Sequence, residues 1–165
     1  MIYFDNLSSW PDEVIQDCVE FSAPERLKSA TVVVSDIHFD FEEHLASKTF
    51  KDVNEAIEWD GLAFLNDKVV YVHLKQGVDY PLVWWVNEKL PGSYMRGMCL
   101  ISPEEYFIYC IAHELRHLEQ MLTTKRLGRG FNDADDEMDA DLYAIIKLNE
   151  WRRQPRQTPV MALHR

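Results

Sequence analysis

The sequence predicts an α+β fold in which a small twisted sheet packs against helices. Short segments rich in β-branched and aromatic residues, bounded by turn residues, lie between positions 31 and 101, and such segments are typical of strands. Two long stretches without helix-breaking residues follow, at 103–127 and 133–153. Because 47% of the 165 residues are hydrophobic, the chain has enough apolar material for one core.

The first third of the chain predicts a helix and a buried strand. An amphipathic helix is expected from Pro11 to Lys28, interrupted near Pro24, with an inward face of Val14, Ile15, Cys18, Val19 and Leu27. Thr31–Val34 is β-branched and predicts a strand. Polar residues that alternate after it admit a second metal site, but such alternation is the ordinary pattern of a half-buried strand, which we favour. These residues are Asp36, His38 and Asp40.

The middle of the chain predicts a hairpin and further strands. Segments 62–65 and 69–74 flank Asn66-Asp67-Lys68, which suits a tight turn. His73 in the second segment is interpreted as a packed or surface histidine and not as a ligand. Segment 82–86 suits either a strand or a short buried helix, with its two tryptophans in the core. The remaining expectations are a short helix at 53–58, a loop at 87–97 and a strand at 98–101.

The first of the two C-terminal helices has clear start and stop signals. Ser102 suits the N-cap, Pro103 the first helical position, and Glu105 the acidic position of a capping box. Gly128 suits the stop at the other end. Its apolar residues recur every three or four positions, so one side of this helix is expected to be buried.

This helix carries the motif His113-Glu114-Leu115-Arg116-His117, which has the form His-Glu-x-x-His. Side chains four residues apart lie one turn above each other on the same face of a helix. The two histidines can therefore offer imidazole nitrogens to one metal ion, and Glu114 can act as a general base toward water on that ion. Arg116 is expected to face away and to pair with an acid.

The second long helix supplies a third ligand. A catalytic zinc site needs three protein ligands and an open position. On the second helix Glu137, Ala140, Asp141 and Ala144 share one face, and the small alanines allow close approach to the first helix. Glu137 is predicted to bind the metal. Asp141 is predicted to accept the outer N–H of a liganding histidine, which fixes its tautomer.

His113-Glu114-x-x-His117, followed after residues 118–136 by Glu137-x-x-Ala140-Asp141, resembles the gluzincin metallopeptidases. It is most similar to the small ImmA/IrrE-like and phage-associated members. The resemblance covers roughly residues 102–150. It implies a zincin-like fold, Zn²⁺ on His113, His117 and Glu137, Glu114 as base and Asp141 as orienter. The metzincin pattern is excluded, because Gln120 and Thr123 stand where it requires Gly and a third His.

The expected function is zinc-dependent hydrolysis of peptide bonds in a protein substrate. The alternative is a zinc-containing protein that binds a partner without cutting it, as an acidic decoy or a regulator. An intact Glu114 favours the enzyme, because a purely structural site has no use for a base beside its ligands. Cys110 lies one turn before His113 and is interpreted as a small buried hydrophobe. Candidates to stabilise the oxyanion are Tyr80, Tyr94 and Tyr143.

The composition limits the kinds of partner and the cellular location that we expect for this protein. A formal charge of −11 argues against direct nucleic-acid binding and favours a basic protein or peptide partner. The sequence lacks a transmembrane stretch and a basic leader, and its three cysteines suit reduced thiols, so a cytoplasmic protein without membrane contact is expected. Residues 1–153 are predicted to form a single domain, and the locally basic 154–165 a flexible tail.

Overall fold

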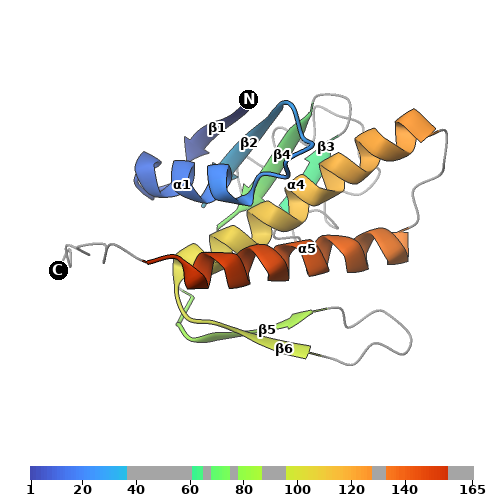
Figure 1. Ribbon diagram of the computed structural model, residues 1–165. Coiled ribbons are helices and arrows are strands. Elements are labelled where there is room, and N and C mark those ends of the chain that lie inside the picture. The colour runs from blue at the N-terminus through green and yellow to red at the C-terminus, as the bar shows by residue number, and fades with distance from the viewer. Residues whose placement is uncertain (37–60, 65–67, 75–77, 87–95, 128–132, 156–165) are drawn as a thin grey trace, which may run out of the picture.

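The computed structural model describes residues 1–36, 61–64, 68–74, 78–86, 96–127 and 133–155. It is a mixed α and β structure with a small sheet and three helices among these residues, in agreement with the predicted class (Figure 1). No helix of this described part is both long and apolar enough to cross a membrane. The domain boundary and the tail predicted at 154–165 remain predictions, and the expected helix at 53–58 lies outside the described residues.

The main sheet has the strand order β1-β2-β4-β3. Its first two strands, β1 (Ile2–Leu7) and β2 (Ala30–Ser35), are parallel and are joined through α1 (Asp12–Ser22). The strand β1 was not predicted, although its sequence alternates with period two: its even-numbered residues are half-buried and its odd-numbered residues are exposed. A parallel pair needs a crossover connection, and α1 supplies it.

The predicted hairpin is confirmed by the antiparallel pairing of β3 (Gly61–Phe64) and β4 (Val69–His73), in which Phe64 faces Val69. The sequence did not reveal that β4 also pairs in parallel with β2. This pairing leaves β3 at one end of the sheet among the described strands. His73 is buried, as a packed histidine would be.

A second sheet contains β5 (Leu82–Val86) and β6 (Arg96–Leu100), which are antiparallel. Of the two alternatives left open for 82–86, the strand is therefore correct. The side chains of its two tryptophans lie outside what the structure describes. The loop expected at 87–97 was predicted to end too late, because Arg96 and Gly97 belong to β6 and pair with β5.

Helix α1 is shorter than predicted. It ends at Ser22, and Ala23 is extended (φ −64°, ψ 129°). The residue before a proline is disfavoured in the helical region, so Pro24 ends the helix where an interruption was expected and no helix resumes before Lys28. The predicted inward face is largely correct: Ile15, Cys18, Val19 and Leu27 belong to the core, and Val14 packs against it.

The helices α4 (Pro103–Leu127) and α5 (Asp133–Arg153) run antiparallel and side by side (Figure 1). Helix α4 also contacts α1, β3 and β4, and it carries the largest share of the core. Ala140 and Ala144 are fully buried, as expected for small residues on the face of α5 that packs against its neighbours. The site helix is thus held between a sheet and a second helix.

The start of α4 is fixed differently from a capping box. Ser102 Oγ accepts the Glu105 N–H at 3.4 Å, as predicted. The Glu105 carboxylate, however, accepts the N–H of Ile101 at 2.9 Å. It is fully buried and pairs with Arg152 near the end of α5 at 2.6 Å. A buried carboxylate needs such a partner, so this pair ties the start of α4 to the end of α5.

Candidate metal centre

Three side chains from two helices converge at the middle of α4. His113 Nε2 and His117 Nε2 lie 2.9 Å apart. Glu137 Oε2 lies 3.4 Å from His113 Nε2, and Glu137 Oε1 lies 3.2 Å from His117 Nε2. These three residues form a group that could hold a metal ion. The structure therefore brings together the three residues that the sequence proposed as ligands.

The spacing of these donor atoms suits a small tetrahedral cation. Zinc binds His nitrogen and carboxylate oxygen at about 2.0–2.2 Å, which separates neighbouring ligand atoms in a tetrahedron by roughly 3.4 Å. The two imidazole nitrogens lie 2.9 Å apart, and each lies 3.2–3.4 Å from a different oxygen of the Glu137 carboxylate, so the donor atoms have separations of that order. The donor set, two imidazoles and one carboxylate, is also one that zinc accepts. The residues present are therefore of the kind, and at the proximity, that a metal ion requires.

The outer nitrogen of His113 faces Asp141 on α5. His113 Nδ1 lies 3.0 Å from Asp141 Oδ1, although its N–H points off that line. The Tyr109 hydroxyl donates to the same oxygen at 2.7 Å. Asp141 thus lies beside His113, one of the two histidines that the sequence proposed as ligands. Tyr109 was not predicted, although it precedes His113 by one helical turn and that spacing puts both on one face.

The outer nitrogen of His117 faces Gln120, which the sequence reasoning also missed. His117 Nδ1 lies 2.9 Å from Gln120 Oε1. If each histidine carries its proton on the outer nitrogen, Nδ1, then the Nε2 lone pairs of both rings point at the same place. Two lone pairs 2.9 Å apart repel each other unless a cation or a proton lies between them. The chemistry of the donor set therefore calls for positive charge at its centre.

Electrostatics in the absence of metal lead to the same conclusion. Burial disfavours the charged form of His113, but the Asp141 and Glu137 carboxylates outweigh it and raise its pKa to about 10. Burial also lowers the pKa of His117, but the Glu137 carboxylate more than offsets this, and the net effect is a raised pKa. Burial would raise the pKa of Glu137, but the two histidines hold it well below its usual range. The metal-free site therefore retains a proton where a cation fits.

Glu114 is buried, with 8% of its surface exposed, and it does not belong to the three-residue donor group. Its negative charge helps to raise the pKa of both His113 and His117. The carboxylate is therefore within electrostatic reach of both histidines and lies outside the donor group.

Arg116 pairs with acids, as predicted. Its guanidinium binds the Asp139 carboxylate with two nitrogens, at 2.6 and 3.1 Å, and also contacts Glu119. Asp139 comes from α5, so this pair joins the two helices beside the donor set. Nothing in the spacing of the residues singled out Asp139 from the other acids of the run that begins at Asp133.

The remaining candidate residues are three tyrosines and Cys110. The Tyr143 hydroxyl donates to the carbonyl of Ser22 at 3.0 Å, and its role as an oxyanion stabiliser remains a prediction. Tyr94 lies outside the described residues. Tyr80 is partly buried, and burial together with Cys110 and Glu104 raises its pKa to about 12. Cys110 is buried among core residues, as interpreted from the sequence.

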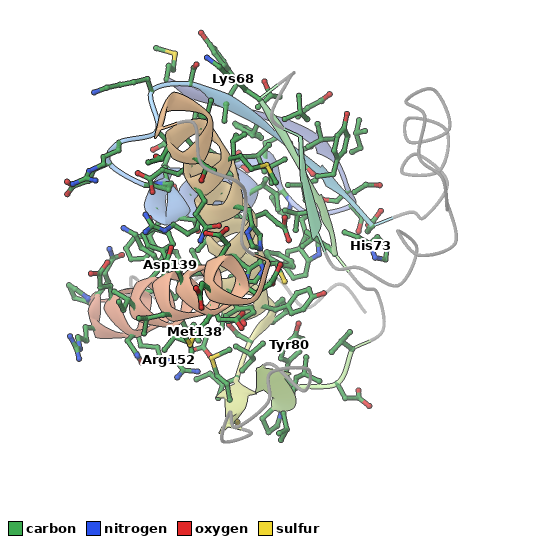
Figure 2. The ribbon with its side chains drawn as sticks, turned by 90° about the vertical axis from the view of Figure 1, so that its right-hand side faces the viewer. Lys68, His73, Tyr80, Met138, Asp139 and Arg152 are labelled. Carbon is green, nitrogen blue, oxygen red and sulfur yellow. The ribbon has the colours of Figure 1, made fainter. Side chains whose placement is uncertain are left out.

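The suggested second metal site is not tested as a whole, because His38 and Asp40 lie outside the described residues. Asp36 accepts hydrogen bonds from the backbone and the hydroxyl of Ser9 at 2.8 and 2.6 Å. His73 lies on the sheet, well separated from Asp139 on α5 (Figure 2). Within the described part of the chain, only the group on α4 and α5 has metal-ligating spacing.

Comparison with known proteins adds no relative. No family model, no curated protein and no solved structure matches this chain.

Proposed function

We propose that this protein is a zinc-dependent metallopeptidase. The observation that carries the proposal is the convergence of His113, His117 and Glu137 on one point from two helices, with donor separations of 2.9–3.4 Å. Zinc is favoured over calcium or magnesium because two of the three donors are imidazole nitrogens, whereas calcium and magnesium prefer oxygen. Other transition metals also accept imidazole, so competition between zinc and these metals tests the assignment of zinc.

Each residue has a distinct part in the proposed chemistry. Zinc in a site with three protein ligands supplies Lewis acidity, which polarises a carbonyl and makes water a better nucleophile near neutral pH. Glu114 accepts a proton from the attacking water and delivers it to the leaving amine. Asp141 holds the outer proton of His113, so that the inner nitrogen keeps its lone pair for the metal.

The end strand of the sheet supports a peptide as substrate. An extended peptide can add to an exposed sheet edge through main-chain hydrogen bonds. β3 ends the sheet among the described strands and contacts α4, the helix that carries the motif. We propose that the substrate binds along β3 and presents its scissile carbonyl to the α4–α5 site. Such binding tolerates many sequences, so specificity would come from side-chain pockets.

The zincin-like fold and the gluzincin assignment, including similarity to the ImmA/IrrE-like group, belong to the same proposal. They are supported by the motif helix α4 followed by a second helix, α5, whose Glu137 and Asp141 both face His113. The alternative, a zinc protein that binds without cutting, lacks a use for the buried Glu114.

The first test combines metal analysis with an unbiased assay. Purified protein is expected to bind one zinc per chain, and zinc is expected to compete effectively against cobalt, nickel and manganese for the site. A peptide library derived from a whole proteome, analysed by mass spectrometry, should show new cleavage sites. These should disappear with a chelator and return when zinc is added. One bound zinc without cleavage would favour the non-cutting alternative, and no metal binding would refute the proposal.

Replacing Asp141 tests the outer contact of His113. Asp141→Asn removes the charge that favours a proton on His113 Nδ1 but preserves the size of the side chain. Zinc affinity is expected to fall about 10- to 100-fold while the stoichiometry stays at one. Competition with a chromophoric chelator measures the change, and Asp135→Asn on the same helix, an exposed position, is the control. Unchanged affinity would show that Asp141 does not orient the ligand.

A further inference from the structure

The amide of Gln120 has a fixed orientation. Its Nε2 donates to the carbonyl of Asp136 at 2.7 Å and to the Asp139 carboxylate at 2.8 Å. Both partners are acceptors and neither can donate. Turning the amide over would therefore lose both hydrogen bonds and set oxygen against oxygen. The remaining atom, Oε1, is the one that lies 2.9 Å from His117 Nδ1.

This orientation determines the tautomer of His117. An amide oxygen can only accept, so the hydrogen bond requires the proton on Nδ1. The lone pair is then on Nε2, which faces His113 and Glu137. Gln120 therefore accepts the Nδ1 proton of His117 through a neutral amide, just as Asp141 is proposed to accept that of His113 through a carboxylate. The His117–Gln120 contact is buried at both residues, so water does not compete freely for Nδ1.

The acceptor that holds Gln120 is itself held from α4. Asp139 receives two hydrogen bonds from Arg116, at 2.6 and 3.1 Å. Asp139 is thus held in place between Arg116 and Gln120. Since Asp136 and Asp139 flank Glu137 on α5, the same contacts fix the distance between the third ligand and the two histidines. Arg116, Asp139 and Gln120 link the two halves of the site.

We infer that Gln120 is a positioning residue of the metal centre: through its locked amide it fixes the tautomer and ring orientation of His117, and through Asp139 and Arg116 it couples that orientation to the placement of Glu137. This inference rests on the metal site proposed above. It extends that proposal, because neither the motif nor Asp141 accounts for the orientation of the second histidine.

The principal test compares three variants of the full chain. Gln120→Met keeps an unbranched side chain of similar length but removes the acceptor. Gln120→Glu keeps an acceptor for His117 Nδ1 while losing both donated hydrogen bonds. Thr123→Ala, at an exposed position one turn further along α4, is the control. Zinc affinity is measured by chelator competition, and urea unfolding of the metal-free proteins shows whether each variant is folded.

Zinc affinity is expected to fall about 10- to 100-fold in Gln120→Met, to fall less in Gln120→Glu, and to stay unchanged in Thr123→Ala. Nuclear magnetic resonance of ¹⁵N-labelled histidine gives a second readout that a general loss of stability would not move. The slowly exchanging Nδ1 proton of His117 should be present in the wild type and in Gln120→Glu and absent in Gln120→Met. The corresponding proton of His113 should remain in all of them.

A double-mutant cycle tests the link through α5. If Gln120 acts through Asp139, then Asp139→Asn and Gln120→Met together should reduce zinc affinity less than the product of their separate effects. Wild-type affinity and an unchanged His117 signal in Gln120→Met would overturn the inference while leaving the zinc proposal intact. A wild-type protein that binds no zinc would overturn both. Independent effects of the two substitutions would remove Asp139 from the mechanism.

Discussion

Glu114→Gln is expected to bind zinc as well as the wild type and to hydrolyse peptides at least about 100-fold more slowly, since general acid–base catalysis contributes about 10²–10⁴-fold. Glutamine has nearly the same shape as glutamate but cannot take a proton from water. Glu114 is outside the donor group of His113, His117 and Glu137, so its replacement leaves the ligands in place. Removing its charge also lessens the competition from protons, because Glu114 helps to raise the pKa of both histidines.

The measurement is the turnover number on the peptides that the library identifies, at saturating zinc and with bound metal determined in the same samples. Glu104→Gln is the matched control, since it makes the same change on α4 three turns earlier and touches no ligand. A variant that keeps zinc and cleaves at the full rate would show that Glu114 is not the base. A variant that loses zinc would instead assign Glu114 a part in holding the site together.

The helices that build the site could be predicted because their signals are local. The stop and start residues around α4, the histidines one turn apart and the alanines of α5 all act within a few residues of one another. The prediction of α5 as 133–153 agrees with the structure. The ligand group also follows from local spacing, once one assumes that the faces carrying His113 and Glu137 meet.

What the sequence did not reveal depends on contacts between distant segments. The parallel pairing of β2 with β1 and β4 is not encoded in any single segment, so β1 and the strand order were missed. The role of Gln120 depends on the groups around its amide, two of which come from α5. Glu105 looked like a capping residue, but burial next to Arg152 gave its carboxylate another partner. Such choices are made by tertiary packing.

The second large effect expected is a reversal of the pH dependence of stability when zinc binds. Without metal, the folded protein raises the pKa of His113 from its ordinary 6.5 to about 10. The contribution of this histidine to stability is therefore complete below pH 6.5 and is lost as pH rises toward 10, by up to about 1.4 kcal/mol per pH unit for one proton. Glu137, whose pKa is lowered, contributes above about pH 4.5 and loses its contribution in acid.

Zinc reverses the sign because it binds deprotonated imidazole and competes with the proton. Between pH 6 and 8 the metal-free protein should become less stable, while the additional stability conferred by a fixed excess of free zinc should increase. Urea unfolding at several pH values in this window measures both trends, with free zinc held constant by a buffer.

Glu137→Gln is the informative variant for this experiment. It removes one of the three carboxylates that raise the pKa of His113 and the main cause of the rise in the pKa of His117. The metal-free protein should then lose less stability between pH 6 and 8, and the gain from zinc should shrink because one ligand is weakened. Parallel pH trends with and without zinc in the wild type would show that these histidines do not exchange protons for metal. In that case His113, His117 and Glu137 would form a proton-linked hydrogen-bond cluster and not a metal centre.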